Sequence, residues 1–269
     1  MANQQVWAFN TVELLVTKIK KRKMKQILIL VFAILNIPSF SQTQFITKGR
    51  IVYERSVNQH KPLEEEGSDN DWWKEMMKSF PKIVKDQYEL KFNETKSVYK
   101  LDKENTDNKY MWGSKPNESD NVVHDFNNQS ISIQREIFEN TYLLKDSLRN
   151  LEWRITQETR EIAGFECKKA VTKICDSVVI VAFYSDQIPV SSGPESMGGL
   201  PGMILGLAIP RMYTTWFAIK LELVEPTLQQ LNPIQKGKKV NWLQLNAELK
   251  KGMKDWGKQG HRLTWGFTL

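Results

Sequence analysis

The sequence predicts a mainly β fold of the α+β class, an antiparallel curled sheet or open half-barrel with a C-terminal amphipathic helix and a short helical insert. Strand-like runs recur through most of residues 45–224, and several alternate apolar with polar side chains, as Ile131 and Ile133 do between polar neighbours. Period-two patterning that is rich in β-branched and aromatic residues is typical of half-buried antiparallel strands. Short connections such as 175–177 suit hairpins, so one sheet is the economical architecture.

The chain begins with a predicted signal peptide over residues 1–41. Residues 27–35 are all apolar, they follow a cluster of six basic residues, and Ser39 and Ser41 have the small-x-small spacing of a cleavage site. The apolar run rises only about 13 Å as a helix, far less than a bilayer core of about 30 Å. Cleavage is expected near Ser41–Gln42. Met24 would make an ordinary start, so residues 1–23 are interpreted as an upstream misreading of the start codon, with a long n-region as the alternative.

The mature part, residues 42–269, is expected to be a single soluble domain in the periplasm or outside the cell, because no Cys follows the apolar run to accept a lipid. The leader holds six of the 38 basic residues but only one of the 31 acidic residues. The mature part therefore keeps a net charge of only about +2, which is too little to collect nucleic-acid phosphates.

Nine segments are predicted as strands in chain order. They are Phe45–Ser56, Gln87–Phe92, Ser97–Leu101, Ser130–Arg135, Thr141–Leu144, Leu151–Thr156, Glu166–Ile174, Val178–Ser185 and Tyr213–Val224. The polar stretch Asp102–Asn121 between the third and fourth of these is predicted to be a loop.

The helical insert is predicted within Glu64–Val84, where an acidic run precedes a cluster of aromatic and methionine side chains. Helical spacing relates Trp73 to Met77 and Phe80, and Pro81 ends the segment. This cluster either covers the core or forms a lid over an apolar cavity, because Met and Trp make adaptable apolar surfaces. The candidate ligand-binding or partner-binding residues are Trp72, Trp73, Met76, Met77 and Phe80.

The C-terminal helix is predicted over Asn241–Trp256, with Asn241 as its N-cap. An apolar stripe runs through Trp242, Leu245, Leu249, Met253 and Trp256, and lysines occupy the opposite face. The stripe is expected to pack on the sheet while the lysines stay in water. Contact of the basic face with anionic lipid is the alternative, so membrane contact is at most peripheral.

A loop rich in Gly and Pro spans Ile188–Gly202, with four Gly and three Pro in fifteen residues, and leads into an apolar strand. Pro201-Gly202 fits the central positions of a type II turn. The loop is either functional or purely structural. The candidate binding residues within it are Gly193, Pro194, Gly199, Leu200, Pro201 and Gly202.

Several motifs together resemble the GLPGLI family of exported Bacteroidota proteins. They include Gly199-Leu200-Pro201-Gly202-Met203-Ile204-Leu205, the run 162–170, the pair of segments 182–185 and 188–189, and the early strand 49–53. Met203 stands where the family name has Leu, and Phe183 where Trp is usual. The resemblance implies an envelope protein with no agreed activity, so no catalytic residues carry over. It also suggests similarity to half-barrels that carry lipoproteins in the periplasm.

No cofactor or metal site is predicted. His60, His124 and His261 are scattered, and neither C-x-x-C nor H-E-x-x-H occurs. Ser196 lies in a segment similar to a nucleophile elbow, but Pro194 replaces the Gly that this strained turn needs. Hydrolase chemistry at Ser196 is therefore not expected.

The function predicted from the sequence is that of a monomeric, non-catalytic envelope protein, not an enzyme, which binds an apolar or peptide-like ligand or an outer-membrane protein. No nucleic-acid partner is expected. Two alternatives stay open: an uncharacterised periplasmic hydrolase, favoured by convergent polar groups with shifted pKa values in one pocket, and a structural accessory of an outer-membrane transporter.

Overall fold

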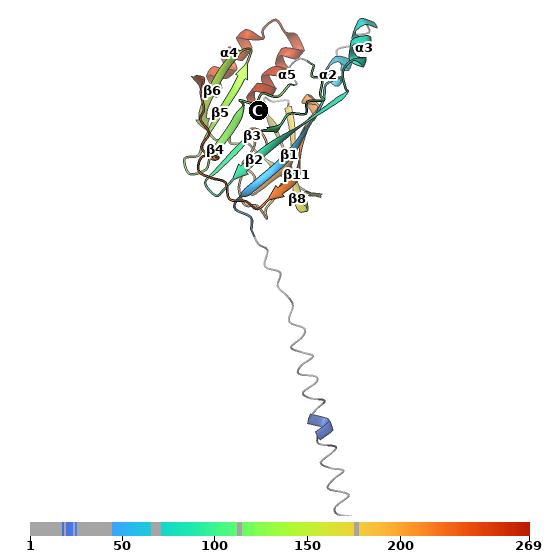
Figure 1. Ribbon diagram of the computed structural model, residues 1–269, viewed down its shortest axis with the longest axis vertical. Helices are drawn as coiled ribbons and strands as arrows, with labels where there is room; N and C mark the ends of the chain where they lie inside the picture. The colour runs from blue at the N-terminus through green and yellow to red at the C-terminus, as the bar shows by residue number, and fades with distance from the viewer. Residues whose placement is uncertain are drawn as a thin grey trace, which may run out of the picture. The chain divides into compact units, whose positions relative to one another are not determined.

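A computed structural model describes residues 18, 20–23, 25, 45–65, 71–111, 115–174 and 178–269, without the side chains of 71–74 and 258–259 (Figure 1). The chain divides into two compact units, Met1–Thr43 and Gln44–Leu269. The few described residues of the first unit are helical and exposed. The predicted signal peptide falls almost entirely outside the described residues and stays a prediction.

The strands that the structure describes form one sheet of twelve, in the order β12-β6-β5-β4-β3-β2-β1-β11-β10-β9-β8-β7. Every pair is antiparallel except β12 with β6. Their bounds are β1 Gly49–Asn58, β2 Ile83–Phe92, β3 Lys96–Lys103, β4 Asn121–Asp125, β5 Ser130–Ile137, β6 Asn140–Ser147, β7 Arg154–Ile162, β8 Phe165–Ile174, β9 Val178–Ser185, β10 Met203–Ile209, β11 Thr214–Glu222 and β12 Lys238–Val240.

The predicted fold class is confirmed, since the sheet is open and mostly antiparallel and helices are few. Eight of the nine predicted strands match observed strands with ends that differ by a few residues, whereas the predicted strand Leu151–Thr156 shares only its last three residues with β7. The short strands β4 and β12 were not predicted. The sequence of β4, NVVHD, does not alternate apolar with polar residues, and β12 has only three residues, too few for a pattern.

Among the described residues of the second unit, five helical segments accompany the sheet. They are α2 Lys61–Glu65, α3 Asp71–Lys78, the 3-10 turn η1 Pro210–Met212, α4 Trp242–Gly252 and α5 Gly257–Thr268. Helix α3 is the predicted insert. Helix α4 begins at the predicted N-cap, where Asn241 and Gln244 form a reciprocal capping box. The predicted helix continues too far, because α4 ends at Gly252 and the separate helix α5 follows.

One face of the sheet carries the core. On β1, Ile51, Tyr53, Arg55 and Val57 share this face by the period-two rule, and the register pairs Tyr53 with Tyr88 of β2. Helices α4 and α5 lie at one end of the sheet in Figure 1. Leu245, Leu249 and Met253 of this region are buried in the same core cluster.

The Gly/Pro loop packs on the concave side of the sheet and fills only part of it, because a cavity remains beside the loop. Ile188, Val190, Met197 and Leu200 are buried there, each contributing about 1.5–3 kcal/mol of apolar burial. Backbone hydrogen bonds from Met203 to Ile188 and from Ile204 to Ser192 tie the loop to the start of β10. The loop is therefore part of the core rather than a surface connection.

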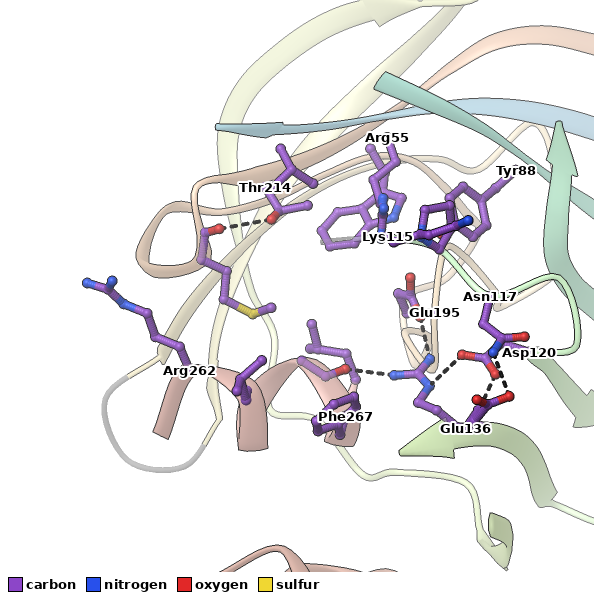
Figure 2. A pocket seen from close by; sticks show the side chains of 18 of the residues that line it. Arg55, Tyr88, Lys115, Asn117, Asp120, Glu136, Glu195, Thr214, Arg262 and Phe267 are labelled. Atoms are coloured by element: carbon purple, nitrogen blue, oxygen red, sulfur yellow. Dashed lines mark hydrogen bonds and ion pairs between the residues drawn. The ribbon is translucent and has the colours of Figure 1, made fainter. Parts of the chain in front are cut away.

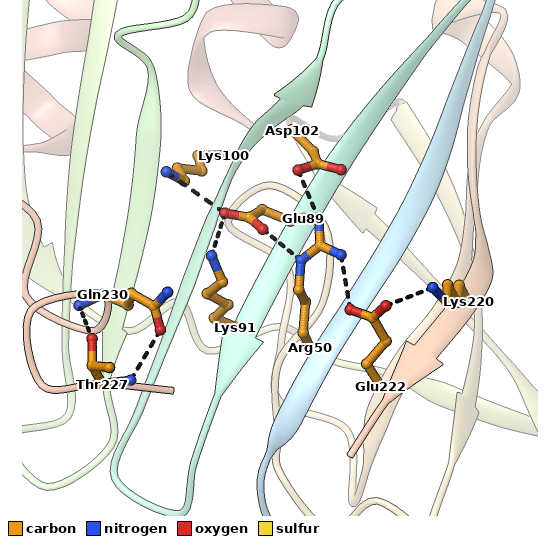
Figure 3. Close-up of polar contacts among 9 residues, drawn as sticks. All are labelled: Arg50, Glu89, Lys91, Lys100, Asp102, Lys220, Glu222, Thr227 and Gln230. Atoms are coloured by element: carbon orange, nitrogen blue, oxygen red, sulfur yellow. Dashed lines mark hydrogen bonds and ion pairs between the residues drawn. The ribbon is translucent and has the colours of Figure 1, made fainter. Parts of the chain in front are cut away.

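On the opposite, convex face of the sheet, ion pairs join neighbouring strands. Arg50 of β1 donates hydrogen bonds to Glu89 of β2 and Glu222 of β11 and forms an ion pair with Asp102 of β3 (Figure 3). The three N···O distances are 2.6, 2.9 and 2.7 Å. A single guanidinium thus links four adjacent strands.

Within the part of the chain that the structure covers, no helix has both the length and the apolar character needed to cross a bilayer.

Candidate functional site

A cavity of about 1150 Å³ opens on the concave face of the sheet. Side chains from β1, β2, β3, β5 and β11 form its walls, and the 115–121 segment, the Gly/Pro loop and α5 complete them. Figure 2 shows Arg55 and Tyr88 at one side, Asp120 and Glu136 at another, and Phe267 on α5. A concave site that combines aromatic walls with a few convergent polar groups is typical of ligand binding.

One wall is a stack of flat side chains. The Arg55 guanidinium lies 5.2 Å from the centroid of the Tyr88 ring, which stacks on Tyr99 at 5.1 Å. Arg55 also donates to the fully buried carboxylate of Asp86 at 3.1 Å. Burial raises the pKa of both Tyr88 and Tyr99, so their hydroxyls stay protonated at neutral pH.

The centre of the site is Arg135 of β5, whose side chain is only 12% exposed. Its Nη2 donates to Glu195 Oε2 at 2.7 Å, and its Nη1 donates to the Gly266 carbonyl of α5 at 2.7 Å. Its Nε lies 3.9 Å from Asp120 Oδ2. Arg135 therefore forms ion pairs with two carboxylates, those of Glu195 and Asp120, which belong to different segments of the chain.

Asp120 is the titratable group best suited to chemistry near neutral pH. Burial raises the pKa of Asp120 to about 6, although the Arg135 cation and a 2.9 Å hydrogen bond from the Glu136 backbone N–H oppose the shift. A carboxyl that titrates near pH 6 can both accept and return a proton under physiological conditions.

Local structure places these groups. Arg135 follows Ile131 and Ile133 on the inward face of β5, so the alternation that buries the isoleucines also buries the arginine. Glu195 lies in the Gly/Pro loop with φ +55°, and the next residue donates its N–H to the Leu269 carbonyl at 2.8 Å. Asp120 immediately precedes β4.

Two further donors in the cavity wall, the Tyr99 hydroxyl and the Trp216 indole N–H, have no hydrogen-bond partner among the described residues. A buried polar group without a partner costs about 1–3 kcal/mol. Both atoms are buried within the wall, so they are not exposed to the cavity.

The six candidate residues of the Gly/Pro loop do not line the cavity. Gly193, Pro194, Leu200 and Gly202 are buried, whereas Gly199 and Pro201 are exposed. The loop instead contributes Glu195. A binding role for the six residues stays a prediction.

Of the Trp72–Phe80 cluster, the described side chains Met76, Met77 and Phe80 do not line the cavity either. Met76, Met77 and Phe80 are half-buried, and the side chains of Trp72 and Trp73 lie outside the described residues. The predicted lid role has no support from this placement and stays a prediction.

Sequence reasoning missed Arg55, Asp120, Arg135 and Glu195. A signal existed for the two arginines, because each continues the apolar face of an alternating strand, where a cation is unexpected. No comparable signal in the sequence marks Asp120 or Glu195, because only the tertiary fold brings these two carboxylates close to Arg135.

The histidines do not form a site. His124 is buried on β4 with Ser97 and Ser192, while His60 is near the Phe80 carbonyl at 3.0 Å. Across the described ranges, no three His, Cys, Asp or Glu side chains are arranged to hold a metal ion.

Comparison with known proteins identifies one matching family. The family model described as "N-glycanase peptide, N-terminal domain" matches residues 77–245, more than half of the chain. No curated protein matches.

Among solved structures, PNGF-II in two crystal forms is 18% and 17% identical over 73% and 81% of this chain, each with a TM-score of 0.48. The chain spans only 32% of the length of those PNGF-II chains. An uncharacterised conserved protein from Thermus thermophilus is 6% identical over 74% of this chain and 93% of its own, with a TM-score of 0.37.

The family match corrects three predictions. The resemblance to the GLPGLI family is wrong, because the motifs that suggested it lie mostly within the matched residues of a different family. The predictions of a non-catalytic binder and of a protein that is not an enzyme are contradicted by the same match. The hydrolase alternative fits better.

Proposed function

This chain belongs to the family described as N-glycanase peptide, N-terminal domain, and on that premise we propose that it is a hydrolase acting on the amide bond between a glycan and a peptide. The concave cavity is the proposed active site. The chain spans 32% of the length of the PNGF-II chains.

The observation that carries the proposal is the setting of Asp120. It is a cavity carboxyl with a pKa of about 6, it lies 3.9 Å from Arg135 Nε, and Arg135 is itself oriented by Glu195 and the Gly266 carbonyl. General acid–base catalysis needs a group whose pKa is near the working pH and whose position is held by its surroundings.

In the proposed reaction, ionised Asp120 accepts a proton from water as the water oxygen bonds to the amide carbon. The protonated Asp120 then gives that proton to the amide nitrogen as the carbon–nitrogen bond breaks. The products are a peptide carboxylic acid and a glycosylamine, so atoms and charge balance. Arg135 is a positioning residue that stabilises the ionised form of Asp120, since an adjacent cation favours a carboxylate.

Asp120→Asn tests this function. The amide cannot accept the proton of water, so kcat on an N-glycosylated peptide should fall by a factor of about 10² to 10⁴. The wild-type rate should rise with pH and level off above about pH 6, where Asp120 is ionised. Mass spectrometry of the peptide product, in which Asn becomes Asp, measures the rate.

The matched control is Asp107→Asn, which removes an exposed carboxylate outside the cavity and should leave kcat unchanged. Thermal unfolding of both variants shows that they fold. An Asp120→Asn variant that is folded and keeps the wild-type rate would overturn the role of Asp120, and a wild-type chain that converts no Asn to Asp would overturn the proposed function.

A further inference from the structure

We propose that helix α5 is a lid on the cavity, and that the cavity opens to large molecules when α5 leaves its contacts and unravels. The lid goes beyond the proposed function, because it rests only on how the cavity is covered. Helix α5 and its neighbour α2 lie outside residues 77–245, so the family match does not extend to them.

Helix α5 forms one wall of the cavity. Leu263, Gly266 and Phe267 of α5 line the cavity, together with Leu269 directly after the helix. Val122 of β4 also lines it, yet the side chain of Val122 is only 2% exposed. A molecule much larger than water therefore reaches Val122 only when part of the wall moves.

The apolar side chains of α5 are less deeply packed than those of helix α4. Leu263, Trp265 and Phe267 of α5 are half-buried. Leu245 and Leu249 of α4 are buried in the core. Elements with few fully buried apolar side chains open at a lower free energy than the rest of a fold, so α5 is the part of this wall that is expected to open first.

The sequence of α5 does not sustain a helix without these contacts. Gly257, Gly260 and Gly266 occupy three of its twelve positions. Glycine disfavours a helix, and a helix of this length is marginal in water even when its residues are good helix formers. When α5 leaves the cavity it should therefore unravel, and its backbone amides should then exchange their protons with water.

One carboxylate joins α5 to α2, which lies beside it in Figure 1. Glu65 of α2 accepts a hydrogen bond from Arg262 Nη2 of α5 at 2.5 Å and another from the Tyr213 hydroxyl. The Arg262 guanidinium also lies 5.6 Å from the centroid of the Tyr213 ring. We call Glu65, Arg262 and Tyr213 the latch. The side chain of Glu65 is 52% exposed, so water and salt compete for the latch and its contribution to closure is modest.

Opening of the lid also changes the surroundings of Arg135. The Arg135 Nη1 donates to the Gly266 carbonyl of α5 at 2.7 Å, and the Ser196 backbone N–H donates to the Leu269 carbonyl at 2.8 Å. Both hydrogen bonds break when α5 leaves the cavity. The polar groups of the cavity are therefore fully held only while the lid is closed.

Thiol labelling tests the lid in the full chain carrying Val122→Cys, with Cys175→Ser to remove one of the two native cysteines. The Val122→Cys thiol lies in the cavity wall, whereas Cys167 is buried outside the cavity lining and reports opening of the sheet itself. With fluorescein maleimide, the Val122→Cys thiol should react at least about tenfold faster than Cys167, because α5 opens without the sheet. Mass spectrometry of tryptic peptides measures the two rates separately.

Two further changes should move the labelling rate of the Val122→Cys thiol in opposite directions. Glu65→Gln weakens the latch and should raise the rate about threefold, as expected for a half-exposed ion pair. Gly266→Ala favours the helix and should lower the rate about fivefold. The alanine Cβ would lie 3.5 Å from Met212 Cε, an ordinary contact. The matched control is Glu64→Gln, whose carboxylate pairs with Lys61 of the same helix, and it should leave the rate unchanged.

Hydrogen exchange of the unsubstituted chain gives a second measurement that needs no variant to fold. The amides of α5 should exchange at least about tenfold faster than those of β1 and β11. The lid is overturned if α5 exchanges only together with these strands, or if the Val122→Cys thiol of a folded variant reacts no faster than Cys167. Equal labelling rates for Glu65→Gln and Glu64→Gln overturn the latch. Neither measurement uses a glycopeptide, so the lid can fail while the hydrolase function stands, and a chain that hydrolyses nothing can still have the lid.

Discussion

The pKa of His124 reflects the burial of its side chain. This side chain is fully enclosed where β4 meets the Gly/Pro loop, with Ser97 Oγ 3.3 Å and Ser192 Oγ 3.4 Å from its Nδ1. Burial lowers the pKa of His124 to about 4, although a hydrogen bond with the Ser196 backbone works against the shift. The imidazole is therefore neutral in the folded protein at any pH above about 4.

This burial predicts a pH dependence of stability. Unfolded His124 protonates near pH 6.5, so between pH 6.5 and 4 the unfolded state binds more protons and the free energy of unfolding falls as pH falls, by up to about 3 kcal/mol. His124→Gln should be less stable than wild type at pH 7 and should lose less stability on acidification. Urea unfolding from pH 4 to 7.5 measures both slopes.

Asp120 contributes with the opposite sign in the same range, because its raised pKa makes stability fall as pH rises through about 6. Comparison of His124→Gln with wild type cancels that contribution. The exposed His261→Gln serves as the control and should keep the wild-type slope. Equal slopes for His124→Gln and wild type would show that His124 is not buried as described.

At the scale of residues, the sequence allows only part of the site to be predicted. Arg55 and Arg135 could have been recognised as cations on apolar strand faces. The pairing of Arg135 with Glu195 could not, because sixty residues separate them and no local pattern joins them. The binding role predicted for the glycines and prolines of the Gly/Pro loop stays a prediction, and the loop residue that lines the cavity is Glu195.

At the scale of elements, the Gly/Pro loop is the most demanding segment. Gly202 has φ +156°, and a side chain there would overlap the Ser185 carbonyl oxygen. A Cβ at Gly193 would lie 2.7 Å from the Ile204 Cβ. The loop can pass inside the sheet only because these positions lack side chains.

Gly202→Ala should therefore lower the free energy of unfolding by more than about 1 and up to about 3 kcal/mol, since neither the backbone nor Ser185 can move freely. The control is Gly252→Ala at the end of α4, where a Cβ would meet no atom within 4 Å. That change should be neutral or slightly stabilising. Urea unfolding compares the two, and equal effects would contradict the packing described for the loop.

Prediction of the elements succeeded where patterns were long. The Asn241 cap was predicted because the cap residue and the apolar stripe after it are local features, and the structure confirms it. Helix α5 was not predicted, because its Gly257, Gly260 and Gly266 disfavour a helix that forms only through packing. Tertiary contacts such as Arg135 with the Gly266 carbonyl supply what the local sequence lacks.

At the scale of the whole molecule, the fold class could be predicted and the family could not. The alternation of apolar and polar residues follows directly from the burial of one face of a strand, so the fold class could be predicted although the family was assigned wrongly. In the structure, the motif that suggested the GLPGLI family lies at the end of the Gly/Pro loop and the start of β10, and its Gly202 leaves no room for a side chain. Residues selected for packing say little about chemistry, and a function inferred from a fold alone is weakly supported.

The middle of the open sheet depends on Arg50, which joins β1, β2, β3 and β11 through three carboxylates. Arg50→Met leaves these partly buried carboxylates without their shared cation and should lower the free energy of unfolding by about 2 kcal/mol. Arg50→Lys should recover only part of this, because an ammonium cannot reproduce the guanidinium fork.

The comparison is Lys48→Met, which breaks an exposed ion pair with Glu225 and should cost less than about 0.5 kcal/mol. The Arg50 effect should also persist in about 0.5 M NaCl, because partly buried pairs are weakly screened. Equal losses for Arg50→Met and Lys48→Met would mean that the convex-face network does not hold the strands together.

The triple engagement of Arg135 has an evolutionary consequence. The guanidinium of Arg135 donates hydrogen bonds to Glu195 in the Gly/Pro loop and to the Gly266 carbonyl in helix α5, and its Nε lies near Asp120. Replacing Arg135 therefore disturbs three segments together. A lineage that loses this arginine must in the same period neutralise position 195 and find another counter-charge for position 120. Positions 120, 135 and 195 should therefore change as a group over descent, and drift at any one of them alone should be rare.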